Sequence, residues 1–194
     1  MRLKHLLTLT IALGCRSRAT SDRMTNLAVE AAAGDSLARY NLAVELYRGD
    51  SLARDYTKAA TLWKQAMEQG SVDATNNYAY LLYYGLGISP DQVRAVSLWK
   101  QAAALGQPES HYHLGDAALT GVGTRADTAE AVGRYRAAIA LAQQSHDSVD
   151  GLVANDAKKA LAKVPPLRSR DRLRADSLAL LYGRTSTRTR PPAA

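Results

Sequence analysis

The chain has 194 residues, of which 46% are hydrophobic, so it is long enough to bury a substantial core. Its single cysteine, Cys15, excludes an internal disulfide framework and a cysteine-based metal site. The formal net charge of +7 is unevenly distributed: residues 163–194 carry eight basic and two acidic side chains, whereas residues 34–145 carry ten basic and eleven acidic ones. The basic character therefore belongs to the C-terminal end of the chain.

The N-terminus has the composition of an export signal. Arg2 and Lys4 precede an apolar run over residues 6–14. This run is shorter than the roughly 20 residues that span a bilayer, but it is typical of a secretory signal peptide. We therefore predict a signal peptide over 1–14 and a tether over 15–21, with a frayed N-terminal helix as the alternative.

Cys15 directly follows the apolar run, as the lipidated cysteine does in a bacterial lipobox. The two residues before Gly14, Ala12 and Leu13, depart from the lipobox pattern, which prefers leucine and then a small residue. Lipidation of Cys15 and ordinary cleavage after Ala19 therefore both remain open. Either one predicts an exported chain, in the periplasm or anchored to an envelope membrane.

A four-residue sequence, Trp-Lys-Gln-Ala, occurs at 63–66 and again at 99–102, and returns as Tyr-Arg-Ala-Ala at 135–138. Four further columns follow the same 36-residue spacing without gaps: Gly34, Gly70 and Gly106; Gly49, Gly85 and Gly121; Asp55, Asp91 and Asp127; Ala59, Ala95 and Ala131. A fixed period of this length is typical of a solenoid, whose units bury their apolar faces only against their neighbours.

Each repeat is predicted to contain two helices. The second one in the first repeat, over 55–69, places apolar residues at i, i+3, i+4 and i+7, with Asp55 as its N-cap and Gly70 ending it. The same pattern predicts second helices over 91–105 and 127–142. First helices are predicted over 36–48, 72–84 and 108–120, and a helix over 22–33 is predicted to cap the array. Because Trp63, Trp99 and Tyr135 share one helical face, we predict that they pack in the core.

The 36-residue register is lost after residue 145. Helices are predicted over 148–163, where Pro165 and Pro166 follow, and over 168–182. Residues 183–194 have no apolar period and are rich in arginine, so a disordered basic tail is predicted there. The predicted domains are thus a repeat domain over 22–145, C-terminal cap helices over 146–182, and this tail.

Residues 23–142 resemble Sel1-like repeats, relatives of the tetratricopeptide repeat with a period of about 36 residues. The motif is clearest at Ala74, Leu81, Gly85, Gly87, Asp91, Ala95, Trp99, Ala102, Ala103 and Gly106. The family has a glycine in the first helix of each repeat. Here that glycine occurs only as Gly115, and the other two repeats have Ala43 and Ala79 at the same position. The resemblance implies an all-α solenoid of about three helix-turn-helix repeats, whose first helices line a concave surface that assembles other proteins.

The residues predicted to bind a partner lie on the first helices, at the spacing i, i+4 and i+7. They are Asn41, Glu45 and Arg48; Asn77, Leu81 and Tyr84; and His113, Ala117 and Thr120. The column Asn41, Asn77 and His113 offers donors and acceptors to the backbone of an extended peptide, although asparagine can instead bond within its own repeat. Tyr80, Tyr83 and Tyr84 add an aromatic patch.

No catalytic, metal or cofactor site is predicted. His111 and His113 are two residues apart and point to different sides of a helix, and no nucleophile is accompanied by a placed histidine and acid. We therefore predict a non-catalytic scaffold that binds a protein or peptide. The alternative is that the arginine-rich tail binds a polyanion or an anionic membrane surface, with nucleic acid disfavoured by the predicted export.

Overall fold

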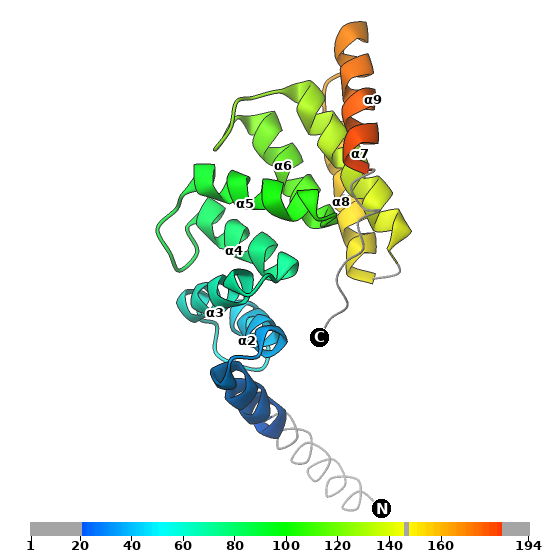
Figure 1. The fold of residues 1–194 in the computed structure, drawn as a ribbon. Helices are drawn as coiled ribbons and strands as arrows, with labels where there is room; N and C mark the ends of the chain where they lie inside the picture. Colours follow the sequence, from blue (N-terminus) through cyan, green and yellow to red (C-terminus); the bar gives the residue numbers. More distant parts are fainter. Residues whose placement is uncertain (1–20, 146–147, 184–194) are drawn as a thin grey trace, which may run out of the picture. The chain divides into compact units, whose positions relative to one another are not determined.

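The computed structural model describes residues 21–145 and 148–183, so the predicted signal peptide, Cys15 and nearly all of the basic tail lie outside the described residues. Within those ranges every regular element is an α-helix and no strand is present (Figure 1). This confirms the all-α prediction. None of the described helices is both long and apolar enough to cross a membrane.

The chain divides into two compact units, with the boundary between Ser71 and Val72. The first unit contains a helix over 21–33, then α2 (Ser36–Arg48) and α3 (Tyr56–Glu68), which pack against each other. The leading helix is tied to α2 by Arg39, whose Nε donates to the Ala31 carbonyl at 3.1 Å. The core of this unit is made largely of alanine, together with Trp63, which is 2% exposed.

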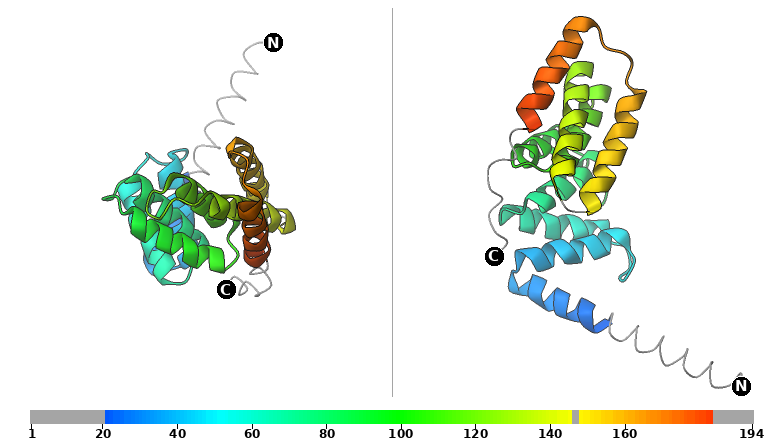
Figure 2. Two further views of the ribbon diagram at one scale, coloured as in Figure 1. Left: turned by 90° about the horizontal axis from the view of Figure 1, so that it is seen from above. Right: turned by 90° about the vertical axis from the view of Figure 1, so that its right-hand side faces the viewer.

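The second unit contains six helices in the part of it that the structure describes. They are α4 (Val72–Tyr84), α5 (Gln92–Ala104), α6 (Pro108–Thr120), α7 (Thr128–Gln144), α8 (Ser148–Lys163) and α9 (Ser169–Gly183). Each of α4 to α7 packs on the next helix along the chain, while α8 and α9 both pack against α7 (Figure 2). The small side chains of this core allow close helix packing.

The predicted starts of the three second helices are confirmed, whereas α7 continues past its predicted end at residue 142 to Gln144. Asp55, Asp91 and Asp127 each accept a hydrogen bond from the backbone N–H three residues later, at 2.9, 2.9 and 3.0 Å. Gly70 has φ +92°, the left-handed region that ends a helix without a Cβ clash. Each cap is formed by residues within one helical turn of the helix end. The sequence alone can therefore locate these capped helix ends.

Helix α9 approaches the backbone of α7 at Gly133. A Cβ added there would come within 2.8 Å of Leu178 Cβ, so only glycine permits this packing distance. The contact also contains charged pairs: Arg174 pairs with Asp127 at 2.7 Å, and Arg136 pairs with Asp176. The helix after the repeats is thus firmly docked on the last repeat.

Candidate functional site

In the first unit, the predicted binding residues lie on α2 at the surface. Asn41 and Arg48 are exposed. Glu45 is partly buried, and one of its carboxylate oxygens lies 3.9 Å from the guanidinium of Arg23 on the leading helix. All three side chains are therefore accessible to some degree, with Glu45 engaged in a weak ion pair.

On α4, the stripe of predicted binding residues, Asn77, Leu81 and Tyr84, is only partly accessible. Tyr84 is 52% exposed and Asn77 is partly buried, but Leu81 is completely buried. The assignment of Leu81 as a binding residue is therefore wrong. Because α4 contacts both α5 and α6, its solvent-facing arc is narrower than the i, i+4, i+7 stripe requires.

On α6, His113 is also misassigned as a binding residue. It is 7% exposed, and its ring stacks on Trp99 with centroids 4.8 Å apart and an interplanar angle of 23°. Ala117 is buried as well. Thr120 is exposed, but its hydroxyl donates to the Asp116 carbonyl at 2.9 Å, as a threonine near a helix end commonly does.

His111 has a structural environment of its own. Its Nε2 lies 3.2 Å from the Ala103 carbonyl, which can only accept, so Nε2 carries the proton and Nδ1 accepts from Arg134 at 3.4 Å. Burial, followed by the charge of Arg134, lowers the pKa of His111 to about 3. Within the described ranges no group of three or more histidine, cysteine or acidic side chains could hold a metal.

The asparagine that joins neighbouring repeats is Asn76, which the predicted stripe does not include. Its Nδ2 donates to Glu109 Oε2 at 2.9 Å, and its Oδ1 accepts from Ser110 Oγ at 2.7 Å. Its carbonyl accepts from Trp99 Nε1 at 3.2 Å. Asn76 is 1% exposed. It differs from Asn77 by one position, and helical periodicity alone does not say which of two adjacent asparagines faces inward.

An aromatic cluster gathers on α4, where it contacts Trp99 of α5 and His113 of α6. The ring centroids of Tyr80 and Tyr84 are 4.6 Å apart, those of Tyr83 and Tyr84 are 5.1 Å apart, and Tyr83 lies 5.0 Å from Trp99. The predicted patch of three tyrosines is thus a real cluster. It joins a buried core residue to the exposed ring of Tyr84.

Asp116, which the sequence does not single out, lies among the tyrosines of this region. Tyr135 donates its hydroxyl to Asp116 Oδ1 at 2.6 Å. Burial, followed by the charge of Asp116 and a hydrogen bond to it, raises the pKa of Tyr112 to about 12. Burial is also the main cause of the raised pKa of Tyr84, to which Tyr80 and Asp116 contribute. One carboxylate thus influences tyrosines from three helices.

A family model for the Sel1 repeat matches residues 36–71, 72–107 and 108–143. The chain belongs to the Sel1 repeat family. Proteins of this family are generally non-catalytic scaffolds that bind other proteins. The boundary between the first and second Sel1 repeats coincides with the boundary between the two compact units.

Two solved structures share the Sel1 fold with this chain. One is a Sel1 repeat protein from Oxalobacter formigenes, with 22% identity and a TM-score of 0.58 over 84% of this chain and 65% of that one. The other is c5321, a protective antigen present in uropathogenic Escherichia coli strains, with 20% identity and a TM-score of 0.67 over 88% of this chain and 36% of that one. This chain therefore spans less than two thirds of either protein. No curated relative matches the sequence.

Proposed function

We propose that this Sel1 repeat chain is a non-catalytic scaffold that binds a segment of another protein at the aromatic surface of α4 and α6. The observation that carries the proposal is the exposed ring of Tyr84, packed against Tyr80 and Tyr83. Tyrosine supplies a large contact area and a polar hydroxyl, and it is enriched at protein interfaces. Asn41, Glu45 and Arg48 on α2 are proposed as a separate set of contacts in the first unit.

The test is affinity capture from an extract of the native cells, with full-length wild-type and variant proteins compared. Tyr84→Ala removes the exposed ring, whereas the matched control Val93→Ala removes an apolar side chain that is 71% exposed on α5. We expect Tyr84→Ala to lose partners that Val93→Ala retains. An identical set of partners for both variants would count against this surface.

Export is proposed on the composition of residues 1–14, with Cys15 as the candidate lipid anchor. Intact mass of the native protein after membrane fractionation tests it. A mass increase of two or three acyl chains on a chain beginning at Cys15 would support anchoring. A chain that begins after Ala19 would support release into the periplasm, and an unprocessed chain would contradict export.

A second candidate function is polyanion binding by the C-terminal tail. The observation that favours it is the segment 184–194, which contains Arg184, Arg188 and Arg190 and no acidic residue. Deletion of this segment should then abolish binding to anionic vesicles or polymers, and binding of the intact chain should weaken steeply with salt. Binding that survives the deletion would contradict the role of the tail.

A further inference from the structure

We propose that the surface around Asp116 recognises one cationic side chain, a lysine ammonium or an arginine guanidinium, of the bound protein segment. The inference rests on the proposed function, because it names the chemistry that the partner must present. We call this surface the Tyr-Asp site and define it as Tyr80, Tyr84, Tyr112 and Asp116.

The first argument is the charge of Asp116. Its carboxylate is partly buried and accepts a hydrogen bond from Tyr135 at 2.6 Å, but tyrosine hydroxyls carry no compensating positive charge. No ion pair joins Asp116 to a basic side chain in the part of the chain that the structure describes. A partly desolvated carboxylate is stabilised by an opposite charge, and a cationic ligand would supply one.

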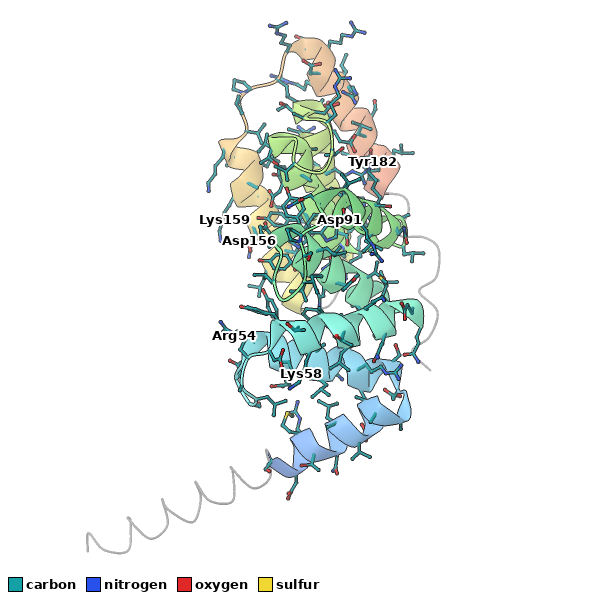
Figure 3. The ribbon with its side chains drawn as sticks, turned by 90° about the vertical axis from the view of Figure 1, so that its left-hand side faces the viewer. Arg54, Lys58, Asp91, Asp156, Lys159 and Tyr182 are labelled. Atoms are coloured by element: carbon teal, nitrogen blue, oxygen red, sulfur yellow. The ribbon has the colours of Figure 1, made fainter. Side chains whose placement is uncertain are left out.

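The surroundings of the Tyr-Asp site do not supply that charge. Helix α8 brings Asp156 close enough to Tyr112 to contribute to its raised pKa, so the neighbouring charge is again negative. Lys159, one turn further along α8, pairs with Asp156 at 3.0 Å (Figure 3). Because Asp156 is paired in this way, the charge that favours a cation over an anion at the site is that of Asp116.

The second argument is the aromatic wall. Tyr84 and Tyr80 pack with centroids 4.6 Å apart, and Tyr84 leaves half of its surface exposed. Tyr112 comes from the adjoining first helix, α6, and lies near the same carboxylate. The faces of aromatic rings attract cations, so a cation near Asp116 would gain from both the carboxylate and the rings. This combination suits a side chain with one positive charge on an apolar stem.

The third argument is that Asp116 and Tyr84 do not recur with the period of the repeats. Positions needed for stacking recur with the period, as in Ala43, Ala79 and Gly115. In contrast, the position of Asp116 is occupied by Val44 and Tyr80 in the other repeats. The position of Tyr84 is occupied by Arg48 and Thr120. Tyr112 differs from these two, because it recurs as Tyr40 and also packs against the core of the third repeat. The exposed ring of Tyr84 and the carboxylate of Asp116 are thus specific to the junction of the second and third repeats.

The direct test is an NMR titration of the full chain with three small probes: Nα-acetyl-arginine amide, Nα-acetyl-lysine amide and Nα-acetyl-citrulline amide. Citrulline has nearly the shape of arginine but no charge. We expect the arginine and lysine probes, at up to about 50 mM, to shift the ring resonances of Tyr84 and Tyr112, and the citrulline probe to leave them unchanged.

The test variant is Asp116→Asn, which keeps an oxygen to accept from Tyr135 and so preserves the local fold. We expect it to weaken binding of the arginine probe by about tenfold or more. The control Asp22→Asn removes an exposed carboxylate in the first unit and should bind as the wild type does. Equal binding of citrulline and arginine, unchanged binding by Asp116→Asn, or no shift with any probe would each overturn the cation site.

The two proposals can fail separately. Partner capture that depends on Tyr84 but is unaffected by Asp116→Asn would remove the cation site and leave the scaffold surface intact. Arginine binding that depends on Asp116, together with partner capture that is unchanged by Tyr84→Ala, would keep the cation site and place the main partner surface elsewhere.

Discussion

The ring of Tyr135 lies directly against the backbone of Gly115, so closely that a Cβ on Gly115 would come within 2.5 Å of Tyr135 Cε1. This arrangement allows the Tyr135 hydroxyl to reach Asp116, one residue further along α6, at 2.6 Å. In the other two repeats the equivalent pairs are Ala43 with Trp63 and Ala79 with Trp99. The third repeat therefore replaces an alanine–tryptophan pair by a glycine–tyrosine pair, and this change links the core to a surface carboxylate.

Gly115→Ala should destabilise the second unit by about 1–3 kcal/mol, because the added methyl group overlaps the Tyr135 ring and forces either residue to shift. Chemical denaturation followed by circular dichroism measures the change. The matched control is Gly151→Ala, on α8, where an added Cβ meets nothing within 4 Å. It should be neutral or stabilising by up to about 1 kcal/mol. Equal effects of the two substitutions would contradict the packing described for Gly115.

The two tryptophans differ in hydrogen bonding, so their replacement by phenylalanine should have different costs. Trp99 Nε1 donates to the Asn76 carbonyl, whereas Trp63 Nε1 is buried with no hydrogen-bond partner among the described residues. Trp99→Phe should therefore cost about 1 kcal/mol more than Trp63→Phe in free energy of unfolding. Trp99→Ala should cost about 3–5 kcal/mol because it leaves a large cavity. A thermal midpoint unchanged by Trp99→Ala would contradict its place in the core.

The lowered pKa of His111 should make the free energy of unfolding fall in mild acid. Its pKa is lowered to about 3 in the folded chain from an ordinary value of 6.5, so the unfolded chain binds more protons between these two values. The contribution of the neutral, buried His111 to the free energy of unfolding is therefore fully present above pH 6.5. It is lost as the pH falls toward 3, because protonation of this histidine favours the unfolded chain. Between pH 7 and pH 5 the loss should be about 2 kcal/mol. Denaturation curves of His111→Gln should show a shallower pH dependence than wild type over this interval, and parallel curves would contradict the assignment.

Tyr182 should hold α9 on α7. Tyr182 lies on α9 (Figure 3). Its hydroxyl donates to Glu130 at 2.7 Å, and its ring lies 3.6 Å from the guanidinium carbon of Arg134. Tyr182→Phe removes the hydrogen bond and should cost about 1–2 kcal/mol, while Tyr182→Ala also removes the cation–π contact. Hydrogen exchange of the α9 amides should become faster in the order wild type, phenylalanine, alanine. The control Leu180→Ala, at a residue 63% exposed, should leave exchange unchanged. If all variants exchange alike, Tyr182 does not secure the helix.

Much of the fold could be predicted because its signals are local. The 36-residue period located three helix pairs, and the caps at Asp55, Asp91 and Asp127 marked where the second helices begin. The recurrence of Trp63 and Trp99 on one helical face correctly placed them in the core. Each of these inferences needs only the geometry of a single helix and the fact that repeats stack.

The candidate site was less predictable, because exposure depends on what packs against a helix from elsewhere in the chain. Leu81 and His113 each have the spacing expected of an exposed face on their own helix, yet both are buried. Trp99 of α5 stacks on His113, and α4, which carries Leu81, packs against α5. Asp116 is an ordinary helix-surface acid in the sequence, and only the tertiary contact with Tyr135 shows its role. An i, i+4, i+7 pattern shows that side chains lie on the same side of a helix axis. It does not show how much of the helix surface on that side faces solvent.

The sequence by itself thus determined the repeat architecture, the capped starts of the second helices and the residues that recur where neighbouring repeats pack. The tertiary structure alone decided which side chains remain accessible, and it brought Asp116 together with tyrosines from three helices. Tyr182 and Glu130, 52 residues apart, meet for the same reason. Periodicity and capping act over a few residues, whereas burial and charge pairing are set by contacts between distant segments, which a periodic pattern does not encode.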